Sequence, residues 1–154
     1  INARSETVAE KPTFRDSFRH RRCLVPASGF YEWKKSTQGR IPFLVQIRDV
    51  RAYAMAGIWS RWSGPNGALD TFSVLTTRAA PKIQDIHERM PVILHPSSYS
   101  VWLDYRSGRG ELESLCNPVP DEFITVRRVS DRVNSARNDD PSCEAKPTVQ
   151  NSLF

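Results

Sequence analysis

The chain has 154 residues, 39% of them hydrophobic and 10% aromatic, which suffices for the core of one folded domain and argues against global disorder. No apolar run approaches the roughly 20 residues that a membrane-spanning helix needs, so we expect a soluble protein. The net charge of +5 favours a polyanionic partner, although many basic proteins have none.

In chain order, the first half predicts one helix followed by several strands. Phe14 and Phe18 lie four residues apart within 11–22, the spacing of one face of a short helix. Strand-like apolar runs then occupy 22–33, 42–49, 52–59 and 71–77. Turn-forming residues at 36–39 and 63–67 separate them, so we expect hairpin loops at both places.

The second half predicts short helices alternating with short strands. We expect one or two helical turns within 80–89, because the residue before Pro91 is driven out of the helical region. A strand should follow at 91–95. The third element is a short helix at 97–105 with a serine N-cap, for which the candidates are Ser97 and Ser98.

The last expected strand is 123–130, and no strand–helix–strand alternation typical of a parallel sheet occurs. The sequence therefore predicts a strand-rich α+β fold, with a mainly antiparallel sheet or partly closed barrel and short flanking helices. We expect a domain at 1–137. The polar, proline-containing sequence at 138–154 predicts an extended C-terminal tail.

The segment GFYEW at 29–33 places a carboxylate within a strand-like run. Strand alternation puts Glu32 on the same face as Phe30, opposite Tyr31 and Trp33. If that face points inward, burial raises the carboxyl pKa towards neutrality, as a general acid or base requires. The alternative is an ordinary outward-facing glutamate on a half-exposed strand.

The segment IHERMP at 86–91 contributes a histidine, whose imidazole can shuttle protons near neutral pH. A surface or packing role for His87 is the alternative. A zinc peptidase is excluded because Pro91 stands where HExxH requires its second histidine. The absence of GxSxG likewise leaves a serine-hydrolase elbow unsupported.

Three widely separated cysteines, Cys23, Cys116 and Cys143, form no CxxC pair. Their odd number and spacing predict neither a zinc site nor a disulfide framework. We therefore expect no metal, no cofactor and a reducing, cytoplasmic location.

Two arginine groups are candidates for contacts with nucleic-acid phosphates. The first lies within 15–22 and the second within 127–137. From them we select Arg19, Arg21 and Arg137 as DNA-binding candidates. Solvated protein faces carry similar charge groups, so charge alone leaves the partner open.

Six ordered motifs resemble the SOS-response-associated peptidase (SRAP) family. They are NARSET at 2–7, RRCLVPASGFYEW at 21–33, AGIW at 56–59, FSVLTT at 72–77, IHERMPVIL at 86–94 and VSDRVNSARNDDPSC at 129–143. The resemblance covers nearly the whole chain. It implies a sensor of abasic sites in single-stranded DNA, whose N-terminal Cys reacts through amine and thiol with the deoxyribose aldehyde to form a thiazolidine crosslink. It also implies self-processing, peptidase- or lyase-type activity in the DNA damage (SOS) response.

The resemblance assigns roles to individual residues. Asn2 would hold the sugar, Glu32 would act as acid and base, and His87 would assist sugar opening and proton transfer. Arg4 and Thr76 match positions beside the phosphate or sugar of the lesion.

The family's nucleophilic Cys precedes the Asn-Ala-Arg motif and is absent from these 154 residues. We therefore expect the chain to be a fragment of a longer domain, inactive by itself in crosslinking. A second hypothesis is a module that binds single-stranded DNA without covalent chemistry. A third, a thiol protease using Cys23 with His87, requires an exposed Cys23 with a lowered pKa.

The last five residues, QNSLF, suggest a separate contact. Gln150, Leu153 and Phe154 resemble the peptide with which bacterial proteins dock on the replicative sliding clamp. The alternative is a chain end that happens to finish with apolar residues. Together these hypotheses place the protein in the cytoplasm, in association with the nucleoid, and away from membranes.

Overall fold

Two β-sheets organise the protein, as a computed structural model covering residues 2–37, 39–65 and 67–147 shows. The larger sheet has the order β1-β6-β5-β2, with β7 paired to β6 and β8 to β5. Its strands are β1 (Asn2–Arg4), β2 (Arg22–Ala27), β5 (Tyr53–Gly64), β6 (Gly67–Arg78), β7 (Arg89–Pro91) and β8 (Ile93–Leu94). The smaller sheet, β3-β4-β9, comprises β3 (Phe30–Ser36), β4 (Gly39–Ile47) and β9 (Ile124–Arg128).

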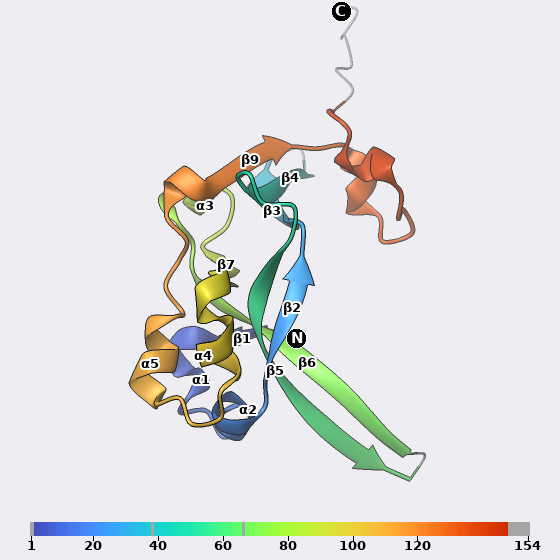
Figure 1. The fold of residues 1–154 in the computed structure, drawn as a ribbon. Coiled ribbons are helices and arrows are strands. Elements are labelled where there is room, and N and C mark those ends of the chain that lie inside the picture. Colours follow the sequence, from blue (N-terminus) through green and yellow to red (C-terminus); the bar gives the residue numbers. More distant parts are fainter. Residues whose placement is uncertain (1, 38, 66, 148–154) are drawn as a thin grey trace, which may run out of the picture.

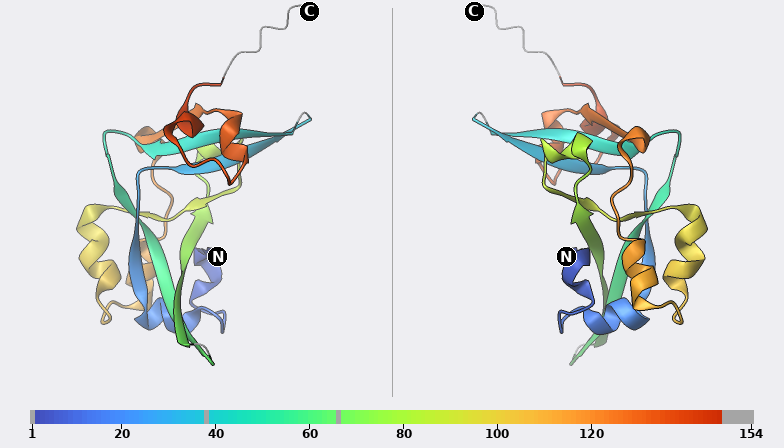
Figure 2. Two further views of the ribbon diagram at one scale, coloured as in Figure 1. Left: turned by 90° about the vertical axis from the view of Figure 1, so that its right-hand side faces the viewer. Right: turned by 90° about the vertical axis from the view of Figure 1, so that its left-hand side faces the viewer.

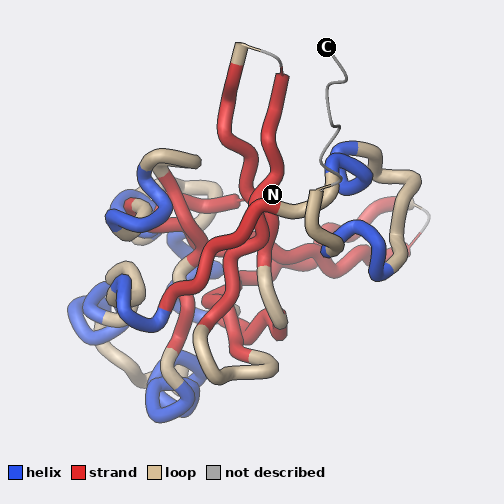
Figure 3. The backbone as a smooth tube through the Cα atoms, turned by 90° about the horizontal axis from the view of Figure 1, so that it is seen from above, coloured by secondary structure: helices blue, strands red, loops and turns tan. Residues whose placement is uncertain are grey.

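Short helices cover one side of the larger sheet, and the smaller sheet lies across its end (Figures 1 and 2). The helices on this side are α1 (Ser5–Val8), α2 (Arg15–His20), α4 (Tyr99–Leu103) and α5 (Arg109–Ser114), whereas α3 (Pro81–Gln84) lies beside β9 of the smaller sheet (Figure 1). The 3-10 turns are η1 (Pro96–Ser98), η2 (Asp121–Phe123), η3 (Asp131–Asn134) and η4 (Pro141–Glu144). The β5–β6 hairpin extends beyond the remaining strands (Figure 3). The predicted α+β, strand-rich fold is confirmed.

The first core lies between the larger sheet and the helices. Alternation along the strands sends Ile58 and Leu75 to this side, where they pack in one cluster with Phe18 of α2 and Trp102 of α4. Because each helix is at most six residues long, this apolar contact rather than helix propensity stabilises it.

The second core lies between the two sheets. The opposite face of β5 contributes Tyr53 and Met55, which cluster with Val45 of β4 and Ile124 of β9. Phe30 of β3 packs against the same cluster from the smaller sheet. The larger sheet therefore packs against helices on one face, and the opposite face packs against the smaller sheet at the end where β5 begins.

Both expected hairpins are present. Ser36 pairs with Gly39 between β3 and β4, and Gly64 pairs with Gly67 between β5 and β6. Gly39 and Gly67 have φ angles of +123° and +115°, which residues other than glycine rarely adopt. Hence the glycines at these positions suit the chain reversals.

Three details differ from the sequence-based expectations. The run 22–33 forms two strands in different sheets, and a Cβ on Gly29 at the break would lie 2.9 Å from a Leu44 methyl carbon. The helix within 80–89 ends early, at Gln84. Neither expected serine caps the helix at 97–105, because the His95 side chain accepts the Ser97 amide there instead.

The segment following Asn138 also differs from an extended tail. Pro141–Glu144 forms a 3-10 turn, Cys143 is buried, and the Ser130 amide donates to the Ala145 carbonyl at 2.9 Å. These contacts fold the chain back as far as Ala145. The part of the expected tail at 148–154 lies outside the described residues. Among the residues that are described, no helix is long and apolar enough to cross a membrane.

Candidate active site

Glu32 lies on β3, on the strand face that also carries Phe30. Its side chain is 19% exposed, and burial raises the pKa of its carboxyl above the ordinary value, although nearby His87 acts in the opposite direction. A raised pKa retains the acidic proton towards neutral pH. The inward alternative for Glu32 is therefore the one that the geometry favours.

His87 lies between α3 and β7, where its ring approaches Glu32. Its Nδ1 is 4.0 Å from a Glu32 carboxylate oxygen, 3.1 Å from the Arg89 amide nitrogen and 3.0 Å from the Arg89 carbonyl oxygen. The amide can donate to an unprotonated Nδ1, and a protonated Nδ1 can donate to the carbonyl. The turn thus accommodates Nδ1 both with and without a proton, so it fits either tautomer of the ring.

Arg89 links the strands around this pair, although the sequence analysis did not select it. Its guanidinium donates to both carboxylate oxygens of Glu6, at 2.7 and 2.8 Å, and to the Thr76 carbonyl and hydroxyl oxygens. This hydrogen-bonded ion pair lowers the pKa of Glu6. The pair ties the NARSET segment to β6 and to the turn that carries His87.

Asn2, Arg4 and Thr76 lie on the neighbouring strands β1 and β6. These strands pair in parallel, with Asn2 opposite Val74 and Arg4 opposite Thr76. Ala3, between them, packs in the helix-side core, so Asn2 and Arg4 occupy the other face of the sheet. That face is the one towards the smaller sheet and its Glu32.

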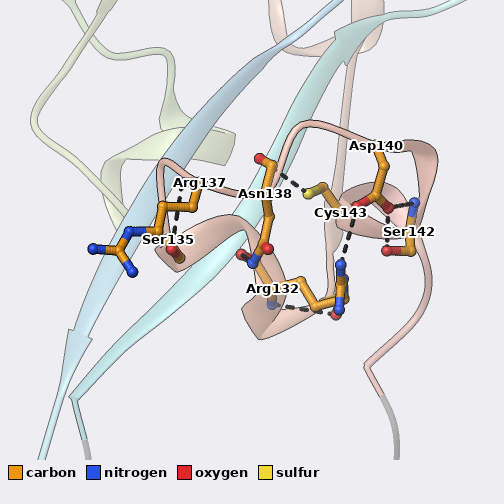
Figure 4. Close-up of polar contacts among 8 residues, drawn as sticks. Arg132, Ser135, Arg137, Asn138, Asp140, Ser142 and Cys143 are labelled. Atoms are coloured by element: carbon orange, nitrogen blue, oxygen red, sulfur yellow. Dashed lines mark hydrogen bonds and ion pairs between the residues drawn. The ribbon is translucent and has the colours of Figure 1, made fainter.

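The three other arginine candidates do not join this group. Arg19 belongs to α2 on the helix side, and Arg21, which follows α2, is ion-paired with Asp16. Arg137 lies after η3, and Figure 4 shows its side chain directed away from the neighbouring Arg132–Asp140 ion pair. The predicted DNA-binding residues therefore lie on more than one surface.

The C-terminal turns support β3 from its outer face. The Trp33 indole donates to the Asn134 side-chain oxygen at 2.7 Å. Asn134 is the last residue of η3. Beside it lies a small polar network in which Arg132 binds Asp140 at 3.0 Å and Asn138 donates to the Arg132 carbonyl at 2.7 Å (Figure 4). This network lies behind the strand whose inner face carries Glu32.

None of the three thiols has the environment of an activated nucleophile. Burial raises the pKa of Cys23, and it raises that of Cys116 to about 12. Cys143 is buried beneath the C-terminal turns. A thiol protease based on Cys23 and His87 is thus disfavoured. In the part of the chain that the structure covers, no three His, Cys, Asp or Glu side chains gather as metal ligands would.

The fold and the site define a strand-rich α+β protein with a carboxylate–imidazole pair where its two sheets meet. Residues 1–136 match the model of the family described as SOS response associated peptidase (SRAP), and the chain belongs to this family.

Two relatives and one solved structure illustrate the similarity. The chain is 38% identical to abasic site processing protein YoqW of Bacillus subtilis, over 92% of this chain and 64% of YoqW. It is 33% identical to mouse abasic site processing protein HMCES, over 94% of this chain and 49% of HMCES. A crystal structure of a Bacteroides thetaiotaomicron protein matches with a TM-score of 0.88 and 32% identity, over 94% of this chain and 65% of that one. The chain thus spans about half to two thirds of these proteins.

Proposed function

We propose that the chain supplies the acid–base pair and the DNA-holding strands of a domain that senses abasic sites in single-stranded DNA and crosslinks to them. The observation that carries this proposal is the half-buried Glu32 carboxyl, with a raised pKa, 4.0 Å from His87 Nδ1. The relatives YoqW and HMCES, both named as abasic site processing proteins, support the same substrate.

The proposed chemistry joins an aldehyde to an aminothiol with loss of one water. The amine attacks the aldehyde carbon of the ring-opened deoxyribose, and His87 moves a proton from the attacking nitrogen to the former carbonyl oxygen, which becomes a hydroxyl. Protonated Glu32 donates to this hydroxyl, which leaves as water, and the Glu32 carboxylate takes back the remaining proton on nitrogen, giving an imine. The thiol sulfur then adds to the imine carbon and its proton passes to nitrogen, which closes a thiazolidine.

The aminothiol of this reaction is an N-terminal Cys. Cys23, Cys116 and Cys143 are internal residues without a free α-amine, so none of these three thiols supplies it. The same acid–base pair would serve self-processing, including autocatalytic removal of an initiator Met. We do not propose cleavage of other proteins.

DNA would lie along the face of β1 and β6 that carries Asn2, Arg4 and Thr76. Arg89, already bonded to Thr76, stabilises the backbone of that face. Arg137 would contact the DNA strand near β3. Arg21 would first have to exchange Asp16 for a phosphate.

The protein's wider setting follows from the same proposal. We propose a location at the nucleoid during the DNA damage (SOS) response, with a domain at 1–137 followed by a C-terminal segment. The sliding-clamp contact through Gln150, Leu153 and Phe154 lies outside the described residues and stays a prediction.

The proposal is tested by intact mass spectrometry of the protein purified from its natural reading frame. Incubation with single-stranded DNA carrying one abasic site should add the mass of the DNA minus one water. The same strand with thymine at that position serves as control and should add nothing. If neither strand forms an adduct while both bind, the protein is the alternative, a non-covalent single-stranded-DNA-binding module.

A further inference from the structure

A basic pocket lies on the helix side of the larger sheet, between α2 and the loop before α5. It encloses about 560 Å³, within the range of small-molecule sites. Phe18 and Leu112, both part of the helix-side core, form its floor. Arg15, Arg19 and His20 line one wall, and Tyr105 lies on the other.

The two walls are held together by one buried side chain. The Arg22 guanidinium donates to the carbonyls of Phe18 and Arg19 on α2, at 2.7 and 2.6 Å. It also donates to the carbonyls of Trp102 and Asp104 on the facing segment, both at 2.6 Å. Arg22 is 8% exposed, so these bonds are shielded from water. The pocket is therefore preformed, and a ligand need not order it.

Some charged side chains of the pocket are paired with an opposite charge, and others are not. Arg109 contacts Glu10 and Glu113, and Asp16 contacts Arg21. Within the described chain, by contrast, neither Arg15 nor Arg19 has a carboxylate within ion-pair distance. Two exposed guanidinium groups on successive turns of α2 thus remain available for an anion.

An exposed aromatic ring completes the pocket. Tyr105 is 74% exposed, and the Arg106 guanidinium, paired with Asp104, lies 5.8 Å from its ring centroid. Flat rings beside cationic groups are the combination with which proteins bind single-stranded nucleic acid, since bases stack on the ring while the cations meet the phosphates.

We propose that this pocket binds a nucleotide of the DNA strand, with a phosphate at Arg15 and Arg19 and the base against Tyr105. The inference rests on the proposed function for its choice of DNA as the polyanion. It adds a second anchor, separated from Glu32 and His87 by the larger sheet. A DNA strand bound both at this pocket and near Glu32 and His87 would wrap around an edge of the larger sheet.

The test compares two double variants with the same change of charge, Arg15→Ala/Arg19→Ala in the pocket and Arg48→Ala/Arg51→Ala in the loop between β4 and β5. Binding of undamaged oligothymidylate is measured by fluorescence anisotropy over a range of salt concentrations. The strand should have about 30 nucleotides, longer than the roughly 4–16 that one site covers. The pocket variant should weaken binding about tenfold and lower the salt slope by roughly 0.7 per lost phosphate contact.

Two further measurements separate base stacking and catalysis from this result. Tyr105→Ala should weaken binding of the long strand about fivefold or more, as loss of one stacked base does, without changing the salt slope. Adduct formation with abasic DNA is measured separately on the wild-type protein, where it tests the proposed function. Affinity and salt slope equal to those of the Arg48/Arg51 control would overturn the inference, even where the adduct forms. A missing adduct with the expected loss of affinity would instead overturn the proposed function alone.

Discussion

Glu32 and Glu6 each contact one residue of the HERMP segment, and they do so in opposite ways. Glu6 makes a two-pronged ion pair with Arg89, which lowers its pKa. Glu32 lies 4.0 Å from His87, and burial raises its pKa. A tight partner thus fixes a carboxylate in its charged state, whereas burial beside a more distant partner favours a carboxyl that keeps a transferable proton.

The largest expected effect is on the chemistry of Glu32. Glu32→Gln keeps the shape of the side chain but removes its titration, so adduct formation with abasic DNA should slow by about 10²–10⁴-fold, the usual contribution of general acid–base catalysis. Single-turnover gel assays at saturating DNA measure the rate. Glu88→Gln, an exposed neighbour of His87 with the same charge change, is the control. Equal slowing in both variants would remove Glu32 from the acid–base role.

The second expected effect is on stability, where the two glutamates should differ in sign. The folded pKa of Glu6 lies below its ordinary 4.5, so its ion pair stabilises the protein above that pH and is lost as pH falls through the folded pKa. The folded pKa of Glu32 lies above 4.5, so its charge opposes folding at higher pH and that cost vanishes on acidification.

Urea unfolding of the two variants between about pH 3 and pH 7 tests this difference, because the interval spans the ordinary pKa of a glutamate. At neutral pH, Glu6→Gln should lose about 1 kcal/mol, a modest value because solvent screens the half-exposed Glu6 side chain. Glu32→Gln should gain stability there. Both differences should shrink at the acidic end. If the two variants shift in the same direction at neutral pH, the contrast between the sites fails.

The smallest expected effect concerns the support behind β3. Asn134→Ala leaves the Trp33 indole without its acceptor and should cost about 1 kcal/mol in unfolding free energy, the net value of one hydrogen bond. Ser135→Ala, whose hydroxyl only accepts a peripheral amide at 3.4 Å, is the matched control. If the network also positions Glu32, Asn134→Ala should shift the pH–rate profile of crosslinking. An unshifted profile would confine Asn134 to stability.

Local patterns predicted much of this molecule because strands obey a two-residue period. This period predicted that Glu32 shares a strand face with Phe30, and the turn-forming glycines predicted both hairpins. It did not reveal that the run 22–33 changes sheet at Gly29, because that break depends on the close approach of Leu44, a contact between distant strands.

Polar contacts between residues far apart in the sequence also could not be predicted from local patterns. Glu6 and Arg89 are 83 residues apart, and nothing in either segment alone marks them as partners. Arg89 nevertheless belongs to the IHERMP motif. Its position between a histidine and an expected strand was the signal that could have marked it as a site residue. The turn at Pro141–Glu144 was missed for a similar reason, since polar composition says little about where Cys143 is buried.

The buried Arg22 has a consequence for how the chain folds. Its guanidinium joins carbonyls 3 and 4 residues away to others 80 and 82 residues away. Losing either group leaves donors unsatisfied in a dry environment, so α2 and α4 cannot open one at a time without a penalty. We expect their amides to exchange hydrogen for deuterium together, as one cooperative unit built from two ends of the sequence.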